Sequence, residues 1–102
     1  MWAPVTERPP CELRLYVAGD GPNSVQARSN LQRICAGAPG YRYTLEVIDF
    51  LADPLRALAD GVLVTPTLVK VGPAPRCTVV GTLADHAKVQ RTLGIVPTQE
   101  GG

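Results

Sequence analysis

Cysteine, histidine and paired carboxylates are the residues of this chain that could do covalent or acid–base chemistry. The three cysteines, Cys11, Cys35 and Cys77, form no CxxC pair and have no metal-ligand spacing. A disulfide-exchanging thiol needs a helix N-terminus, where backbone N–H groups lower its pKa. The loop that opens the first predicted helix, residues 20–24, contains no cysteine, and Cys35 lies about three helical turns further on. The pattern therefore excludes disulfide exchange by the usual route and indicates free thiols.

The remaining reactive side chains favour structural roles. His86 has no cluster of Cys, Asp or Glu at metal-ligand spacing, so we expect a solvated histidine. The Gly19-x-Gly21 segment lacks the further glycine and the lysine of a phosphate-binding loop. Asp49 is expected to end a strand and Asp53 to cap a helix, which explains both without acid–base chemistry. The sequence predicts a protein that is not an enzyme and that uses no metal and no cofactor.

Length and charge limit the kinds of protein that this chain can be. At 102 residues the chain has room for one domain with one core. A net charge of +1 argues neither for nucleic acid nor for an anionic membrane, so we expect neither as a partner. No apolar run approaches the roughly 20 residues of a membrane span. Residues 1–10 contain no apolar signal region, so we expect a cytoplasmic location. We expect flexible tails over 1–11 and 96–102, and a single domain over 12–95.

Alternating apolar residues predict four strands. They cover Glu12–Ala18, Tyr43–Phe50, Thr67–Val71 and Thr78–Val80. A helical crossover separates the first two strands, which should therefore run parallel. The last two are joined by so short a turn that they must be antiparallel neighbours.

Caps and helical periodicity predict three helices. Asn23 can cap the first, with Gln26 in the capping-box position, and Gly37 ends it. Its predicted inward residues are Val25, Leu31, Ile34 and Cys35.

The second and third helices have their own boundary signals. Asp53 and Pro54 open the second as cap and first helical residue. Its predicted inward residues are Leu55, Leu58, Ala59 and Val62. Thr82 and Asp85 match a capping box that opens the third helix, which stops at Gly94.

A proline at the start of a strand identifies the fold class. Pro66 cannot donate to a sheet ladder, so it should stand where the third strand begins. The junction Thr65-Pro66-Thr67 resembles the place where thioredoxin-like folds put a cis-proline. We therefore expect an α/β, thioredoxin-like fold of βαβαββα order with a four-stranded mixed sheet.

Two motifs then resemble the KaiB family of circadian-clock proteins. One is Leu13–Gly19 followed by Pro22–Val25, and the other is Thr65–Val71. Shorter matches at Val47–Asp49, Val79–Leu83 and Lys88–Val89 extend the likeness from about Leu13 to Leu93. The sensor domain of the clock histidine kinase SasA shares this frame.

The resemblance implies a non-catalytic regulatory binding protein. KaiB-like proteins switch between a tetrameric ground state of βαββααβ order and a thioredoxin-like monomer that binds the ATPase ring of KaiC. The implied partners are a KaiC-type ATPase, KaiA, and a histidine kinase of the SasA or CikA type. Residues 84–93 are rich in helix formers and alternate poorly, so we expect the thioredoxin-like monomer, with the tetrameric ground state as the alternative.

The resemblance also points to residues. The retained Lys70, the basic residue Arg76 after the Pro73–Pro75 turn, and Asn23 and Gln26 of the first motif are candidate partner contacts. Gln26 stands where the clock proteins commonly have arginine. The candidate structural or fold-switch positions are Thr65, Pro66, Pro73, Pro75 and Gly81.

Two other interpretations stay open at the level of sequence. One is a SasA-type sensor domain, or a stress-related relative outside the clock, that holds the thioredoxin-like arrangement permanently. The other is a redox protein in which Cys35 or Cys77 works in a non-standard way.

Overall fold

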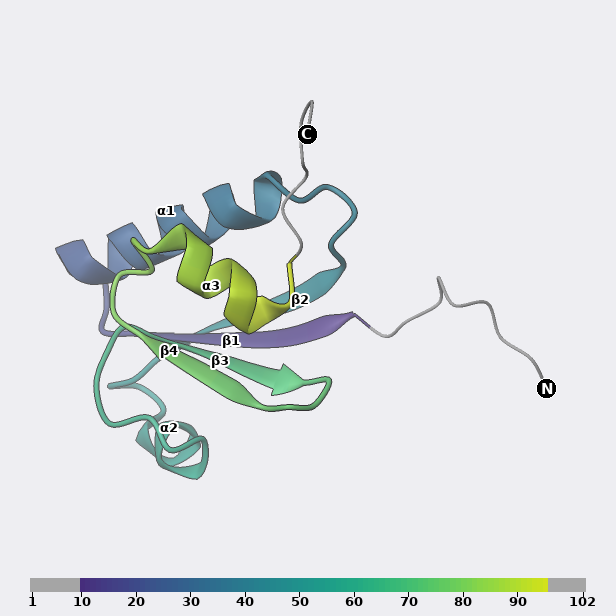
Figure 1. The fold of residues 1–102 in the computed structure, drawn as a ribbon. Helices are drawn as coiled ribbons and strands as arrows, with labels where there is room; N and C mark the ends of the chain where they lie inside the picture. The colour runs from purple at the N-terminus through teal and green to yellow at the C-terminus, as the bar shows by residue number, and fades with distance from the viewer. Residues whose placement is uncertain (1–9, 96–102) are drawn as a thin grey trace.

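A computed structural model describes residues 10–95 of the chain (Figure 1). Seven elements follow one another: β1 (Cys11–Val17), α1 (Pro22–Ala36), β2 (Tyr43–Asp49), α2 (Pro54–Ala59), β3 (Thr67–Gly72), β4 (Cys77–Val80) and α3 (His86–Leu93). The predicted βαβαββα order is confirmed. The predicted tails over 1–11 and 96–102 lie outside the described residues, except that Pro10 is described and Cys11 opens β1.

The four strands form one mixed sheet in the order β2-β1-β3-β4. β1 runs parallel to β2 and antiparallel to β3, and β3 runs antiparallel to β4. The first and last pairings are those that the lengths of the connections predict. The thioredoxin-like fold class is therefore confirmed, and the alternative ground-state order βαββααβ is not the one observed.

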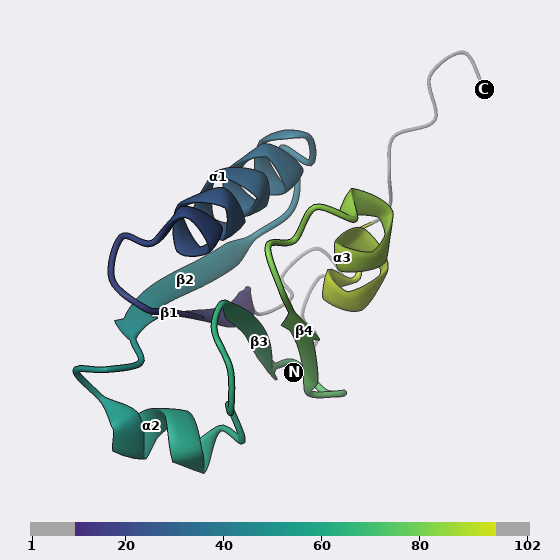
Figure 2. The same ribbon diagram turned by 90° about the vertical axis from the view of Figure 1, so that its left-hand side faces the viewer.

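The helices cover both faces of the sheet. Figures 1 and 2 show α1 and α3 together on one face and α2 alone on the other. The buried residues divide in the same way: Leu13, Leu15 and Val17 of β1 join the cluster under α1 and α3. Tyr16 of β1 joins Ile48, Ala57, Val62 and Val69 in a smaller cluster under α2. The central strand is thus buried on both faces, as its position in the sheet requires.

The start of α1 differs from the prediction. The helix begins at Pro22, the cap position is Gly21, and no side chain caps it. Asn23 therefore lies in the first turn and is not the cap, because Pro22 takes the first helical position for which its fixed φ is suited. Ser24 is buried and its Oγ accepts a hydrogen bond from the N–H of Ala18 at 3.1 Å.

Val25 was predicted to face the core but is 50% exposed. Ala27 takes the inward position instead and is fully buried, together with the correctly predicted Leu31, Ile34 and Cys35.

The buried face of α2 was also predicted wrongly. Asp53 and Pro54 stand at the expected boundary, although the Asp53 side chain makes no cap hydrogen bond. The only buried residue of the helix is Ala57, whereas Leu55, Leu58 and Ala59 are exposed. Val62 is buried as predicted. The helix has six residues, so its single inward residue fixes which face meets the sheet.

The third helix starts one turn later than the capping box predicts. Leu83 has a left-handed φ of 64°, which no helical residue adopts, so the helix cannot include it. Asp85 is the cap, and its carboxylate accepts from the N–H of Lys88 at 3.1 Å. Gly94 ends the helix at φ 75°, as expected for a left-handed C-cap.

Among residues 10–95, three proline bonds are cis: Thr65–Pro66, Gly72–Pro73 and Ala74–Pro75. The first matches the hypothesis drawn from the strand-opening motif. Between residues 10 and 95, no helix combines the length and hydropathy needed to cross a bilayer.

These caps make a prediction about stability. Asp85→Ala should lower the free energy of unfolding by about 1 kcal/mol, because the Lys88 N–H loses its acceptor. The matched control is Asn23→Ala, which removes no cap and should cost less than about 0.5 kcal/mol. Urea unfolding followed by circular dichroism measures both. Equal losses would contradict the assignment of the caps.

Candidate functional site

Large apolar side chains are exposed on and around α2. They are Leu51, Leu55, Leu58, Leu63 and Val64, with exposed fractions from 52% to 80%. We call these five residues the α2 apolar surface. Leu55 and Leu58 share one face of the helix because they are three residues apart. No element of the described chain covers α2 on its outer side (Figure 2). Exposed apolar clusters of this kind mark sites of protein–protein contact.

A buried polar network lies between α2 and the sheet. Its centre is Asp60, directly after α2, whose side chain is only 5% exposed. The Asp60 carboxylate accepts hydrogen bonds from Arg14 at 2.9 and 3.0 Å, from the hydroxyl of Tyr16 at 2.5 Å, and from Arg76 at 2.8 Å. Arg14 and Tyr16 belong to β1, and Arg76 immediately precedes β4. One carboxylate therefore joins three separate parts of the fold.

The electrostatics of the network favour an ionised carboxylate. Burial by itself would raise the pKa of Asp60, but the hydrogen bonds from Tyr16, Arg14 and Arg76 outweigh it and lower the pKa to about 2. Burial and the neighbouring carboxylate together raise the pKa of Tyr16 to about 12. Across the physiological range Asp60 is thus charged and Tyr16 is a neutral donor.

A second ion pair ties α2 to β2 on the outside of the molecule. Arg56 donates to the two carboxylate oxygens of Glu46 at 2.5 and 2.8 Å. These hydrogen bonds lower the pKa of Glu46. The Glu46 side chain is half exposed, and exposed pairs contribute little because water and salt screen them.

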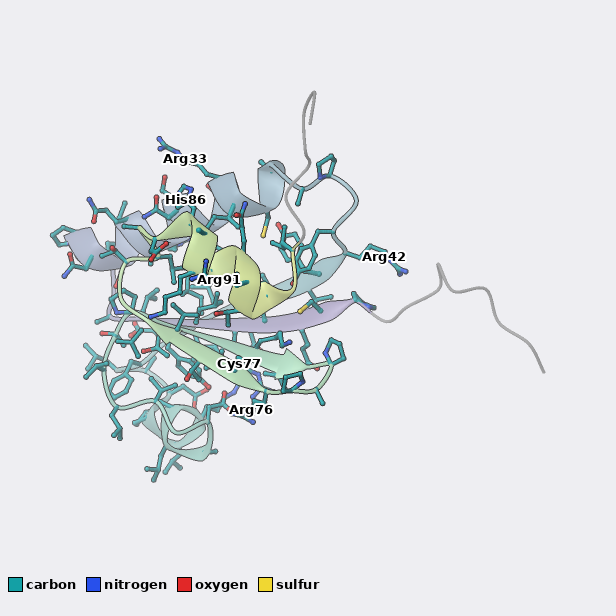
Figure 3. All side chains as sticks on the ribbon, viewed as in Figure 1. Arg33, Arg42, Arg76, Cys77, His86 and Arg91 are labelled. Carbon is teal, nitrogen blue, oxygen red and sulfur yellow. The ribbon has the colours of Figure 1, made fainter. Side chains whose placement is uncertain are left out.

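The four sequence-predicted contact residues are not brought together. Arg76 lies on the α2 side, bound to Asp60, and Figure 3 shows it below the sheet. Asn23 and Gln26 are exposed on α1, over the opposite face. Lys70 is 8% exposed and pairs across the ladder with Leu13 and Cys77, so it offers little surface. Their part in binding stays a prediction.

The predicted structural positions fall into two groups. Thr65, Pro66 and Gly81 lie close together, because the Gly81 N–H donates to the Pro66 carbonyl oxygen at 2.9 Å. Pro73 and Pro75 belong to the turn between β3 and β4 that leads to Arg76. A role for any of the five in fold switching stays a prediction.

The thiols lie away from the apolar surface. Cys11 and Cys35 are buried, Cys77 is half-buried, and all three are free. Burial raises the pKa of the Cys35 thiol, so it is a weaker nucleophile than a free cysteine at neutral pH. Within residues 10–95 there is no group of three or more His, Cys, Asp or Glu side chains placed to hold a metal ion.

His86 has a structural partner, contrary to the solvated histidine that the sequence predicts. Its Nε2 lies 3.4 Å from the side-chain oxygen of Asn30, whose amide donates to the Thr82 carbonyl at 2.8 Å. The contact joins α3 to α1 (Figure 3). Arg33 and Arg91, on the same two helices, point away from the core.

Sequence reasoning missed both main features of the α2 side. The leucines of α2 were assigned to the core because their spacing fits a buried face equally well. Asp60 and Arg14 are 46 residues apart, and no local pattern pairs them. The one available signal was the acidic residue at the C-terminal end of a helix. The helix dipole disfavours a negative charge there, so such a residue indicates a nearby cationic partner.

The fold and the surface together define a thioredoxin-like domain with an exposed apolar face. Comparison with solved structures finds the same fold. The N-terminal domain of Synechococcus elongatus SasA superposes with a TM-score of 0.73 and 26% identity, over 100% of this chain and 97% of that domain. Mitochondrial thioredoxin 3 from Saccharomyces cerevisiae superposes with a TM-score of 0.66 at 13% identity, over 90% of this chain and 84% of that one, which shows the fold alone.

Sequence comparison supplies the family. Residues 14–95 match the KaiB domain. A circadian clock protein KaiB3 from Synechocystis sp. is 42% identical over 85 residues, 83% of each chain. The circadian clock oscillator protein KaiB from Microcystis aeruginosa is 47% identical over 77 residues, 76% of this chain and 74% of that protein. The chain belongs to the KaiB family of circadian-clock proteins, as its motifs indicate.

The lowered pKa of Asp60 predicts acid sensitivity with a definite sign. The pKa of Asp60 is about 2 in the folded protein and 3.8 in the unfolded chain, so its ionised form stabilises the fold fully above pH 3.8. That contribution, about 2 kcal/mol, is lost as the pH falls toward 2. The difference in unfolding free energy between the wild type and Asp60→Asn should therefore shrink on acidification. Urea titrations at each pH measure it, and a difference that stays constant would contradict the lowered pKa.

Proposed function

We propose that this protein is a non-catalytic KaiB-like regulator that binds a KaiC-type ATPase ring through the α2 apolar surface and modulates circadian or related timing. The observation that carries the proposal is the exposure of large apolar side chains on a short helix of a KaiB-family domain. A cytoplasmic location belongs to the proposal, as do KaiA or a SasA- or CikA-type kinase as further partners.

The energetics favour this surface over a polar one. Burying one leucine side chain at an interface is worth about 1.5–3 kcal/mol before the costs of association, so a few such residues can dominate an affinity. Among the described residues, the four most exposed large apolar side chains, at 68% to 80%, all lie in residues 51–64, whereas those of β2 are about 40% exposed. Because these leucines are exposed, they add little to the stability of the fold, whereas a partner would bury them.

Arg76 can add a polar contact to the same interface. Its side chain stays 45% exposed even while it binds Asp60, so a partner that approaches the α2 side can reach it. Asn23 and Gln26, on α1, would serve a partner that approaches from the other face.

A second candidate is a SasA-type sensor or adaptor domain. The observation that favours it is the SasA N-terminal domain, which superposes over the whole chain. Such a domain would bind the same kind of ring but would never leave the thioredoxin-like arrangement. A single set of backbone chemical shifts under all conditions would support it, whereas a tetrameric form populated beside the thioredoxin-like monomer would support a KaiB-like switch.

The binding proposal predicts the effect of a charged substitution. Leu55→Glu combined with Leu58→Glu should weaken binding to a purified KaiC-type ATPase by more than about tenfold, because two charges replace buried leucines at the interface. Both positions are exposed, so the fold should be unaffected. The matched control is Val25→Glu, an exposed apolar position on α1.

The affinities are measured by biolayer interferometry and checked by co-elution. The control should stay within about twofold of the wild type. Full affinity in the double variant would remove the α2 apolar surface from the interface.

The non-catalytic part of the proposal is tested separately. We expect no acceleration of insulin reduction by dithiothreitol, because the loop before α1 has no thiol and Cys35 is buried at the far end of that helix. Turbidity of the precipitating insulin chains measures the rate. A rate above the uncatalysed one that disappears in Cys35→Ser would overturn this expectation.

A further inference from the structure

The α2 apolar surface stands on a helix with few apolar anchors. Of the six residues of α2, only Ala57 is buried, and an alanine side chain offers little area to the core. Val62 adds one buried side chain after the helix. The larger apolar residues all point outward, so they do not hold the helix in place.

Polar contacts make up for this weak anchoring. Asp60 closes α2, and its backbone N–H donates to the Arg56 carbonyl oxygen at 3.0 Å, so the carboxylate is fixed to the end of the helix. The carboxylate reaches Arg14 and Tyr16 on the central strand and Arg76 before the edge strand β4. The Tyr16 hydroxyl also lies 3.1 Å from the Arg56 carbonyl oxygen.

We propose that Asp60, held by Arg14, Tyr16 and Arg76, is the positioning residue that fixes α2 against the sheet and so sets the place of the α2 apolar surface. The importance of this position for binding rests on the proposed function. The fixing of α2 does not, because it is a property of the free protein.

The chemistry of the site explains why one residue has this effect. A carboxylate nearly excluded from water makes strong, charge-assisted hydrogen bonds, and each ties it to a different donor of fixed position. Removing its charge leaves Arg14 and Arg76 without their shared counter-ion. The helix then keeps only the hydrogen bond from the Tyr16 hydroxyl to the Arg56 carbonyl oxygen and the small apolar contact through Ala57. Asp60 stays ionised throughout the physiological range, so the attachment is permanent rather than switched by protons.

The chain offers a matched control on the same helix. Glu46 holds Arg56 through two hydrogen bonds of similar length, but on the exposed side of α2. If any ion pair at α2 were sufficient to hold the helix in place, Glu46→Gln and Asp60→Asn would loosen it equally. Only a buried attachment predicts a difference between them.

Hydrogen–deuterium exchange of the free protein tests the positioning directly. In Asp60→Asn, amides of residues 57–64 should exchange about tenfold faster or more, while those of α1 and α3 keep their protection. Glu46→Gln should change the same amides by less than about threefold. Unchanged protection in Asp60→Asn, or an equal loss over the whole domain, would overturn the proposal. Should Asp60→Asn fail to fold, Arg76→Gln replaces it, since it removes one attachment and leaves two, with a smaller rise expected at the same amides.

Binding to a purified KaiC-type ATPase then separates the two proposals. If the wild type binds, Asp60→Asn should bind several-fold more weakly although no residue of the α2 apolar surface has changed. Wild-type affinity in Asp60→Asn would overturn the importance of the Asp60 attachment for binding and leave the proposed function standing. No binding by the wild type would overturn the proposed function, and the exchange measurement would still decide whether Asp60 fixes α2.

Discussion

The carboxylate of Asp60 is the interaction on which the α2 side of this molecule depends. It is nearly excluded from water, and it receives hydrogen bonds from two guanidinium groups and a phenol that come from different parts of the chain. Its hydrogen bonds outweigh the cost of burying the charge, so the carboxylate stays ionised. Because its three donors come from separate parts of the fold, it also ties the end of α2 to the central strand and to the start of β4. The opposite side of the sheet is different: there α1 and α3 are held by a continuous apolar cluster and need no such device.

This division explains how much of the fold could be predicted from the sequence. Strands and helices were found in the correct order because alternation, prolines and glycines are local signals that the fold leaves intact. Cap residues were less secure: Asn23 and Thr82 had suitable side chains, but Pro22 and the left-handed Leu83 decided where the helices begin. For a six-residue helix such as α2, periodicity cannot decide which face is buried. Leu55 and Leu58 fit a core pattern and are exposed, while Ala57 carries no pattern and is buried.

The proposed binding surface could be predicted least well, for the same physical reason. An apolar residue in a sequence indicates burial, and only the three-dimensional arrangement shows whether the fold or a partner buries it. The four polar contacts suggested by family motifs are dispersed: Lys70 is nearly buried, Arg76 is engaged by Asp60, and Asn23 and Gln26 lie on the opposite face. The family itself was recognisable because the motifs at the start of α1 and at β3 are specific combinations of residues.

The α2 leucines are exposed, and α2 meets the sheet through Asp60, only when the free chain adopts the thioredoxin-like arrangement. Backbone chemical shifts of the isolated protein, combined with its mass from light scattering, test this most directly. We predict helical shifts over His86–Leu93, strand shifts over Thr67–Gly72 and Cys77–Val80, and the 10.8 kDa mass of a monomer. Strand shifts over residues 87–93 together with the mass of a tetramer would contradict it.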